Sequence, residues 1–408
     1  MSKTEMPSIR FYGFDNDWEQ RKLGDIVERV VRKNTSNESS LPLTISAQYG
    51  LVDQITYFNN RVASRDVSNY YLVLNGEFAY NKSTSDGFPF GAVKRLDLYE
   101  KGVLSTLYIV FSIKNQSEID SDYLTVFFDT DRWHKGVSER AAEGARNHGL
   151  LNISADDFFD IDIFLPRHKE EQVAIGSYLR HLDHLITLHQ RKLEKLTNVK
   201  KSMLEKMFPR NGSCYPEIRF KGFTDPWEQR KLGELISEYK ETVDSSCTLP
   251  VLTSSKTEGV ILQEEHFGRK QQHDITGYNV LPRSYCTYRN RSDGVDFTFN
   301  VNECCDMGII SKFYPVFCGN DNDTYFLSLV LNNSDEVVHE IAYTCTGTGQ
   351  KVLSFLDLQK MSIRVPRHNE QKKISTYFKQ LDHLITLHQR ELEKLQSIKK
   401  ALLEKMFV

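Results

Sequence analysis

The chain contains nearly the same sequence twice, and this internal repeat constrains its fold more than any other feature. Residues 9–24 read IRFYGFDNDWEQRKLG and residues 218–233 read IRFKGFTDPWEQRKLG, which are identical at 12 of 16 positions. A longer segment at 165–208 returns in closely similar form at 365–407. The 408 residues are therefore expected to form two copies of one unit of roughly 200 residues.

Two variable stretches, 25–164 and 234–364, lie between the repeated segments and share only a thin pattern. Tyr80 matches Tyr288, and the turn letters Ser85-Asp86-Gly87 match Ser292-Asp293-Gly294. The run Gly102–Ser105 likewise matches Gly308–Ser311. Similar spacing of turn and core residues predicts one fold that carries different surface side chains in its two copies.

Short runs of β-branched and aromatic residues predict strands in both variable stretches. These runs are YLVLNGEFAY (71–80), LYIVFSI (107–113), YLTVFF (123–128), YFLSLVL (325–331) and MSIRVP (361–366). Turn residues separate them, so we expect a mixed α/β domain in each copy.

The long repeated segment has the heptad pattern of a coiled-coil helix. Its seam residues alternate in steps of four and three over more than four heptads, and those of the second copy lie 199 residues further on. Pro166 and Pro366 stand just upstream, where proline marks the approach to a helix. The seam of the first copy is Ile175, Leu179, Leu182, Ile186, His189, Leu193, Leu196, Lys200, Met203 and Met207, and that of the second is Ile374, Phe378, Leu381, Ile385, His388, Leu392, Leu395, Lys399, Leu402 and Met406.

A lone amphipathic helix of this length would leave its seam in water, so each helix needs an apolar partner. We expect the two helices to pair with each other, antiparallel, because duplicated units usually pack about a pseudo-twofold axis. The alternative is that each helix packs only on its own globular unit. For His189 and His388 in the seam we favour a role in register, with a metal ligand or a pH switch as the alternative.

The predicted fold class is α+β, with two mixed α/β domains joined by two long helices that form an antiparallel coiled coil. The expected boundaries are 1–164 for the first domain, 165–210 for the first helix, 211–364 for the second domain and 365–408 for the second helix.

The charge of the chain is unevenly distributed. The net charge of −3 argues against a nucleic-acid binder that works by bulk charge. Residues 167–208 and 367–407 nevertheless each contain nine basic and five acidic residues. The basic helices could face DNA phosphates or an acidic partner, and the alternative is a solvated polar surface.

Several classes of protein are disfavoured by composition and motifs. All seven cysteines lie in the second half without a CxxC pair, which predicts reduced thiols in a cytoplasmic protein and no metal site. The chain has no long apolar run for a membrane span and no signal peptide at its start. No phosphate loop, (N/D)PP(Y/F) methyltransferase motif, PD…(D/E)xK nuclease motif, HExxH or GxSxG motif is present, so we predict that the chain is not an enzyme.

The two WEQRKLG segments, each followed by a variable domain and then by PRHxE(E)Q and LDHLITLHQRxLEKL…KMF, resemble the specificity subunit of type I restriction–modification systems. The resemblance covers the whole chain. It implies that each variable domain is a target recognition domain for one half of a bipartite DNA site, and that the coiled coil sets the spacing.

The resemblance also implies partners: double-stranded DNA, two methyltransferase subunits and restriction subunits, with no membrane. S-adenosylmethionine, ATP and Mg would act in those subunits, and this chain would hold no cofactor. Two alternatives stay open, a DNA-binding regulator or an assembly scaffold that works without a methylase. A neighbouring gene that encodes a methyltransferase would favour the specificity subunit over both alternatives.

Candidate DNA contacts are polar, basic and aromatic residues in turns, because such side chains bind base edges and phosphates. In the first copy they are Tyr80, Asn81, Lys82, Ser83, Lys94, Arg95, Arg140 and Arg146, and in the second Arg269, Lys270, Tyr288, Arg289, Asn290, Arg291 and Lys351. The turns at 80–85 and 288–292 occupy equivalent places in the two copies, which favours them over scattered basic residues.

Overall fold

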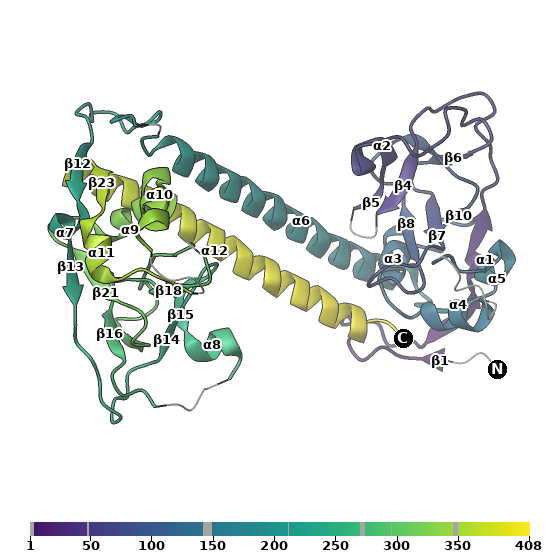
Figure 1. The fold of residues 1–408 in the computed structure, drawn as a ribbon. Coiled ribbons are helices and arrows are strands. Elements are labelled where there is room, and N and C mark those ends of the chain that lie inside the picture. Colours follow the sequence, from purple (N-terminus) through teal and green to yellow (C-terminus); the bar gives the residue numbers. More distant parts are fainter. Residues whose placement is uncertain are drawn as a thin grey trace. The chain divides into compact units, whose positions relative to one another are not determined.

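A computed structural model describes residues 4–46, 49–141, 149–210, 212–269, 274–294, 296–345 and 350–408. The chain forms two compact units (Figure 1). The first unit contains Met1–Gln190 and Arg390–Val408, and the second contains Arg191–Gln389. Both boundaries fall inside a long helix, so each unit takes part of both long helices.

The first unit is built from antiparallel strands and short helices, followed by the start of a long helix. Its strands are β1 (Thr4–Glu5), β2 (Trp18–Lys22), β3 (Val27–Arg29), β4 (Leu43–Ser46), β5 (Gly50–Asp53), β6 (Tyr71–Leu74), β7 (Phe78–Asn81), β8 (Ala92–Arg95), β9 (Lys101–Leu104), β10 (Ile109–Ile113) and β11 (Asp162–Leu165). Its short helices are α1 (Leu23–Ile26), α2 (Gln54–Phe58), α3 (Ser121–Phe127), α4 (His134–Arg140) and α5 (Ala155–Phe159).

The strands of the first unit make one four-stranded sheet and smaller ones. The four-stranded sheet has the order β3-β10-β7-β8, and the three-stranded sheet has the order β1-β2-β11. Two further pairs are β4-β5 and β6-β9. In the four-stranded sheet Tyr80 lies opposite Ile109, which directs the chain after β7 toward the turn that precedes β10.

The second unit repeats this plan. Its strands are β12 (Glu228–Lys231), β13 (Ile236–Tyr239), β14 (Leu252–Ser255), β15 (Gly259–Leu262), β16 (Asn279–Pro282), β17 (Cys286–Thr287), β18 (Arg291–Ser292), β19 (Asn300–Val301), β20 (Met307–Ile310), β21 (Val316–Gly319), β22 (Lys351–Val352) and β23 (Ser362–Val365). Its short helices are α7 (Leu232–Leu235), α8 (Gln263–Phe267), α9 (Thr324–Asn333), α10 (Asp335–Thr344) and α11 (Phe355–Lys360).

The sheets of the second unit correspond to those of the first. The order β13-β21-β17-β19 matches β3-β10-β7-β8, and the pairs β14-β15 and β16-β20 match β4-β5 and β6-β9. The expectation of one fold in two copies is therefore confirmed.

Two of the predicted strands are wrong. Residues 123–127 and 325–331 belong to helices α3 and α9. Each helix starts at an aspartate, Asp120 or Asp323, whose carboxylate accepts a hydrogen bond from a backbone N–H of the first turn. Both helices are buried on most sides, so they lack the polar stripe that reveals a surface helix in a sequence. The runs within 71–80, 107–113 and 361–366 do form strands, as predicted.

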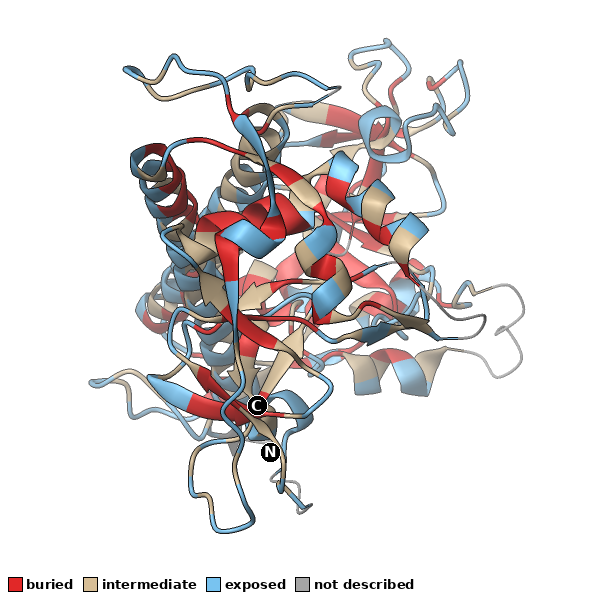
Figure 2. Ribbon diagram, turned by 60° about the vertical axis from the view of Figure 1, so that its left-hand side comes forward, coloured by how far each residue is buried: buried red, intermediate tan, exposed pale blue. Residues whose placement is uncertain are grey.

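Each globular core is closed by the end of a long helix. In the first unit Phe407 contacts Trp18 and Tyr123, with ring centroids 6.2 and 5.6 Å apart. In the second unit Phe208 contacts Trp227 and Phe326 in the same way, at 5.9 and 6.0 Å. The buried segments in Figure 2 lie where strands and helices pack together, whereas the loops are largely exposed.

The repeated WEQRKLG region holds the start of each long helix. Arg10 donates two hydrogen bonds to the Glu171 carboxylate, at 2.6 and 2.7 Å, and the Trp18 indole N–H donates to the same carboxylate at 3.3 Å. Arg219 makes the equivalent pair with Glu370, at 2.7 Å for both bonds. Both glutamates are buried, so the charges neutralise each other where water is excluded.

The two long helices are α6 (Lys169–Lys206) and α12 (His368–Lys405), each 38 residues long. All twenty predicted seam residues are buried or half-buried. These seam residues include the twelve that we predicted to pair the helices: Leu179, Leu182, Ile186, His189, Leu193, Leu196, Phe378, Leu381, Ile385, His388, Leu392 and Leu395.

Contacts within the first unit show that the helices run antiparallel. Trp18, which bonds to Glu171 at the start of α6, also packs on Phe407 beyond the end of α12. Three turns further along α6, Asp183 pairs with Lys399 at 2.6 Å. In the second unit Lys200 pairs with Asp382 at 2.5 Å, which is the same contact displaced by 199 residues. The predicted antiparallel pairing is confirmed, in preference to helices that pack only on their own globular domains.

None of the helices in the described parts of the chain is both long and apolar enough to cross a membrane.

A buried charge network joins the first globular domain to α12. The Asp129 carboxylate accepts hydrogen bonds from Lys94 at 2.7 Å and from Lys399 at 3.2 Å. Burial raises the pKa of Asp129, but Lys94 and Lys399 outweigh this and hold the pKa below its ordinary value. Lys399 also pairs with Asp183, so the network connects β8, α12 and α6.

We expect Asp129→Asn to lower the free energy of unfolding of the full chain by about 3 kcal/mol, because it removes the anion that two largely buried lysines share. The lowered pKa means that the stabilisation is present above the unfolded-state pKa, near 4, and is lost as pH falls through the folded-state pKa. The difference between variant and wild type should therefore be full at pH 6 and shrink below about pH 4.

Urea unfolding at several pH values measures this difference. Asp131→Asn is the matched control, because Asp131 is exposed and pairs only at 3.9 Å with Arg132. A variant Asp129→Asn as stable as this control at pH 6 would show that the network contributes little.

Candidate nucleic-acid interface

The polar turn of the first unit, residues 81–84, continues directly from β7. The Asn81 side chain accepts a hydrogen bond from the Ser83 amide at 3.0 Å, which closes the turn locally. The turn is also bound to residues 149–151: the Thr84 amide donates to the Gly149 carbonyl at 2.6 Å and the Leu151 amide donates to the Lys82 carbonyl at 3.0 Å. The turn is thus held on both sides by backbone hydrogen bonds.

The polar turn of the second unit, residues 289–292, has the same surroundings. Arg291 and Ser292 form β18, which pairs with Lys351 and Val352 of β22. The Leu353 amide donates to the Asn290 carbonyl at 3.0 Å, as Leu151 does to Lys82 in the first unit. The structure therefore places the two turns at equivalent positions, as their sequence spacing predicts.

Tyr80 and Tyr288 are wrong as predicted DNA contacts. Both side chains are fully buried. The Tyr80 hydroxyl donates to the Phe90 carbonyl at 2.8 Å, and the Tyr288 hydroxyl donates to the Leu353 carbonyl at 3.1 Å. Burial raises the pKa of both hydroxyls well above the ordinary value. These tyrosines anchor the polar turns from beneath and do not reach solvent.

Three predicted basic contacts are engaged in ion pairs within the first unit. Lys94 belongs to the Asp129 network described above. Arg95 bonds to Asp97 and Asp122, at 2.6 and 2.7 Å, and Arg140 bonds to Asp160 at 2.8 Å. Carboxylates of the same unit neutralise these three side chains. They therefore add no free positive charge to the surface at the polar turn.

The remaining predicted residues differ in exposure. Ser83, Arg269, Arg289 and Arg291 are exposed, whereas Asn81, Lys82, Asn290 and Lys351 are half-buried. Lys82 directs its ammonium group to the Ile153 carbonyl at 3.3 Å. Arg146 and Lys270 lie outside the described residues.

Sequence reasoning missed a second element of this surface, an exposed apolar residue beside each polar turn. Leu107 is 64% exposed and Phe313 is 38% exposed, and each is the third residue of a β-turn between two strands. The Asn290 amide donates to the Phe313 carbonyl at 2.9 Å, which puts Phe313 next to the second polar turn. Leu107 lies two residues before Ile109, which pairs with Tyr80, so it stands at the end of the sheet where β7 leads into the first polar turn. The matched runs Gly102–Ser105 and Gly308–Ser311, which lead into these turns, were the available signal.

Positive charge gathers around Phe313. The Arg291 guanidinium lies over the Phe313 ring, 4.7 Å from its centroid, and the Lys312 ammonium lies 5.8 Å from it. Burial raises the pKa of the neighbouring Tyr314, and the positive charge of Arg289 partly opposes that rise. Three cations and one exposed aromatic ring therefore share a small surface of the second unit. Such a set can bind phosphates, base edges and the faces of sugars or bases.

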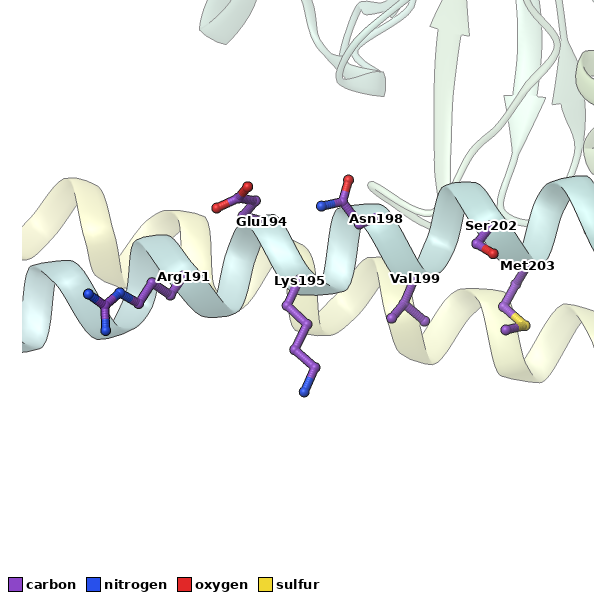
Figure 3. Close-up of a pocket in the computed structure, with 7 residues that line it drawn as sticks. All are labelled: Arg191, Glu194, Lys195, Asn198, Val199, Ser202 and Met203. Carbon is purple, nitrogen blue, oxygen red and sulfur yellow. The ribbon is translucent and has the colours of Figure 1, made fainter. Parts of the chain in front are cut away.

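The long helices present a different surface away from their seams. Apolar residues are exposed there at equivalent places of the two copies, such as Leu188 in α6 and Leu387 in α12. A pocket also lies on the second half of α6, and in Figure 3 Lys195, Val199 and Met203 point to one side of the helix while Glu194 and Asn198 point to the other. Its lining is completed by Arg191 and Ser202. Met203 belongs to the seam and Val199 is half-buried, so it is residues such as Leu188 and Leu387 that expose apolar side chains on these surfaces. Exposed apolar side chains on a charged helix suit a protein partner.

Known proteins resemble the chain along nearly its whole length. The family model of the type I restriction modification DNA specificity domain matches residues 15–198 and 224–397. A Methanocaldococcus jannaschii protein, assigned as the specificity subunit of the MjaX type I restriction enzyme, is 23% identical and aligns over 98% of this chain and 94% of its own length. The specificity subunit of the MjaVIII type I restriction enzyme from the same organism is 21% identical, over 95% of this chain and 91% of its own.

A solved structure has the same fold. The crystal structure of a type I restriction-modification system S subunit from M. genitalium superposes with a TM-score of 0.61 at 12% identity, and the match covers 99% of both chains. The resemblance that the repeated motifs indicate is confirmed. This chain belongs to the family of type I restriction–modification specificity subunits and contains the DNA specificity domain of that family twice.

Proposed function

We propose that the chain reads a bipartite, asymmetric DNA target, with one half of the target read by each unit. The observation that carries this proposal is the pair of equivalent polar turns with different side chains. The first turn offers Asn81, Lys82 and Ser83, and the second offers Arg289, Asn290 and Arg291. The side chains of each turn determine which base edges that unit can bind. Because the two turns carry different side chains, the two halves of the target differ.

The long helices set the separation of the two half-sites in this proposal. A dimeric repressor reads two half-sites at a distance that its own symmetry dictates, and here one chain with two copies takes the place of the dimer. Because α6 begins in the first unit and ends in the second, the length of the helix pair would control the number of unread base pairs.

The catalytic steps belong to partner subunits, since the family is non-catalytic. Two methyltransferase subunits would dock on the off-seam surfaces of the long helices and use S-adenosylmethionine to methylate adenine. Restriction subunits would use ATP and Mg for translocation and cleavage. The support for two docking sites is that Leu188 and Leu387 are exposed at equivalent places of the two copies.

Exchange of a variable stretch should change half of the target. When residues 25–164 are replaced by the equivalent stretch of a related subunit, we expect methylome sequencing to show one altered half-site and one unaltered half-site. The reciprocal exchange of 234–364 is the control and should alter the other half only. Simultaneous change of both halves in either exchange would contradict a division of reading between the units.

Charged substitutions on the off-seam surfaces should remove methyltransferase subunits one at a time. Leu188→Arg places a cation in one of two equivalent apolar surfaces, so the purified complex should retain one methyltransferase subunit instead of two. Leu188→Arg combined with Leu387→Arg should retain none. Thr187→Arg, at an exposed neighbour on another side of the helix, is the control and should keep both. Size-exclusion chromatography with light scattering gives the stoichiometry, and two bound subunits in the double variant would exclude this docking surface.

Lengthening both long helices should lengthen the gap between half-sites. The letters LEKL stand at Leu193–Leu196 and at Leu392–Leu395, so both can be duplicated in phase. Four residues add about 6 Å and about one turn, which keeps the seam nearly aligned and corresponds to one or two base pairs. We expect the methylome to show unchanged half-sites with a longer gap.

The control for this change duplicates only Leu193–Leu196. One helix would then be out of register with its partner, and modification should be largely lost. An unchanged gap in the doubly lengthened chain would mean that the helices do not set the spacing.

A further inference from the structure

We propose that Arg291 reads a guanine in the half-site of the second unit, and that Phe313 holds its guanidinium in the reading position. The inference deepens the proposed function and rests on it. It names the base that one residue recognises.

Arg291 differs from most arginines of the globular domains in what surrounds its charge. Arg95, Arg140 and Arg283 each bond to a carboxylate within their own unit. Among the described residues no carboxylate pairs with Arg291, and its guanidinium instead lies over the Phe313 ring at 4.7 Å. The side chain is exposed. Its charge is therefore available to a ligand while its position is restricted by the ring.

The backbone beneath this pair is fixed from two directions. Arg291 pairs with Val352 in the β18–β22 ladder. The Asn290 amide donates to the Phe313 carbonyl at 2.9 Å, and the Tyr314 amide donates to the Ser311 carbonyl, also at 2.9 Å. Guanidinium and ring thus stand on segments bound to each other. An arginine held in this way loses less rotamer freedom on binding than a free one.

A guanidinium with one face on a ring keeps its N–H edge free. Two parallel N–H donors match the O6 and N7 acceptors of guanine in the major groove, whereas adenine offers one acceptor and one donor there. A phosphate would also accept two N–H bonds, but it needs no aromatic support. Arg289 and Lys312, on either side of the Arg291–Phe313 pair, can supply the phosphate contacts.

The first unit has no equivalent of the Arg291–Phe313 pair. The offset that relates Tyr80 to Tyr288 puts Ser83 at the place of Arg291, and Leu107 occupies the place of Phe313. Neither residue can form a cation–π pair. We therefore assign guanine reading by this pair to the second unit alone, and Ser83→Ala serves as the matched control.

The test uses the chain in complex with its methyltransferase subunits and a duplex that carries the target found by methylome sequencing. Each guanine of the second half-site is replaced in turn by 7-deazaguanine, which removes the N7 acceptor and keeps the base pair. We expect one position to weaken binding by the wild-type complex about tenfold. The complex with Arg291→Ala should bind the unmodified duplex about tenfold less tightly and be indifferent to that replacement.

Further variants separate base reading from charge. Arg291→Lys keeps the charge but not the planar pair of donors that the ring supports, so it should reduce the sensitivity to 7-deazaguanine and keep the salt dependence of binding. Phe313→Leu should reduce the sensitivity. Arg289→Ala should weaken target and unrelated DNA equally and lower the log–log salt slope by about one. Ser83→Ala should leave the response to every replacement in the second half-site unchanged.

Two results would overturn the inference. One is a wild-type complex that tolerates 7-deazaguanine at every position of the second half-site, or a second half-site without guanine. The other is an Arg291→Ala complex that loses target and unrelated DNA to the same extent, which is the behaviour of a phosphate contact. Equal affinity of the wild-type complex for target and unrelated DNA would instead contradict the proposed function itself.

Discussion

The seams of the two long helices are the constraint on which the rest of the structure depends. Neither helix can bury its seam alone, so each unit pairs the first half of one helix with the second half of the other. The pairing brings Met406 and Phe407 into the core of the first unit and Met207 and Phe208 into that of the second. The first unit therefore completes its core only with residues from the end of the chain, so its folding must await a contact of very long sequence separation.

Several residues that the two copies share make the same internal contacts in both. Arg10 and Arg219 bind Glu171 and Glu370 at the helix starts. Gln172 and Gln371 each accept a hydrogen bond from the backbone of an aspartate that caps a buried helix, Asp120 or Asp323. These contacts hold each globular domain to its helix whatever the turns carry. A polar turn can therefore change its side chains without disturbing the attachment, which is what a module with variable specificity requires.

The sequence alone predicts the features that depend on periodic patterns. The seam, the prolines before the helices and the equivalence of the turns after Tyr80 and Tyr288 follow from spacing. Helices α3 and α9 were mistaken for strands because they are buried nearly all round, which leaves no helical periodicity in their polar residues. The pairing of Arg95 with Asp122 and the approach of Phe313 to Arg291 join residues far apart in the chain. No local pattern can distinguish a neutralised arginine from an available one.

That distinction explains how a chain with a net charge of −3 can recognise DNA. Bulk positive charge would bind every sequence alike, since phosphates carry most of the non-specific affinity. Here carboxylates neutralise many basic residues of the globular domains, among them Lys94, Arg95 and Arg140. In the second unit Arg289, Arg291 and Lys312 are gathered at one turn beside an exposed ring. If these side chains read bases as proposed, base contacts would contribute a larger share of the binding free energy than in a protein that binds by bulk charge, and discrimination between sequences would increase accordingly.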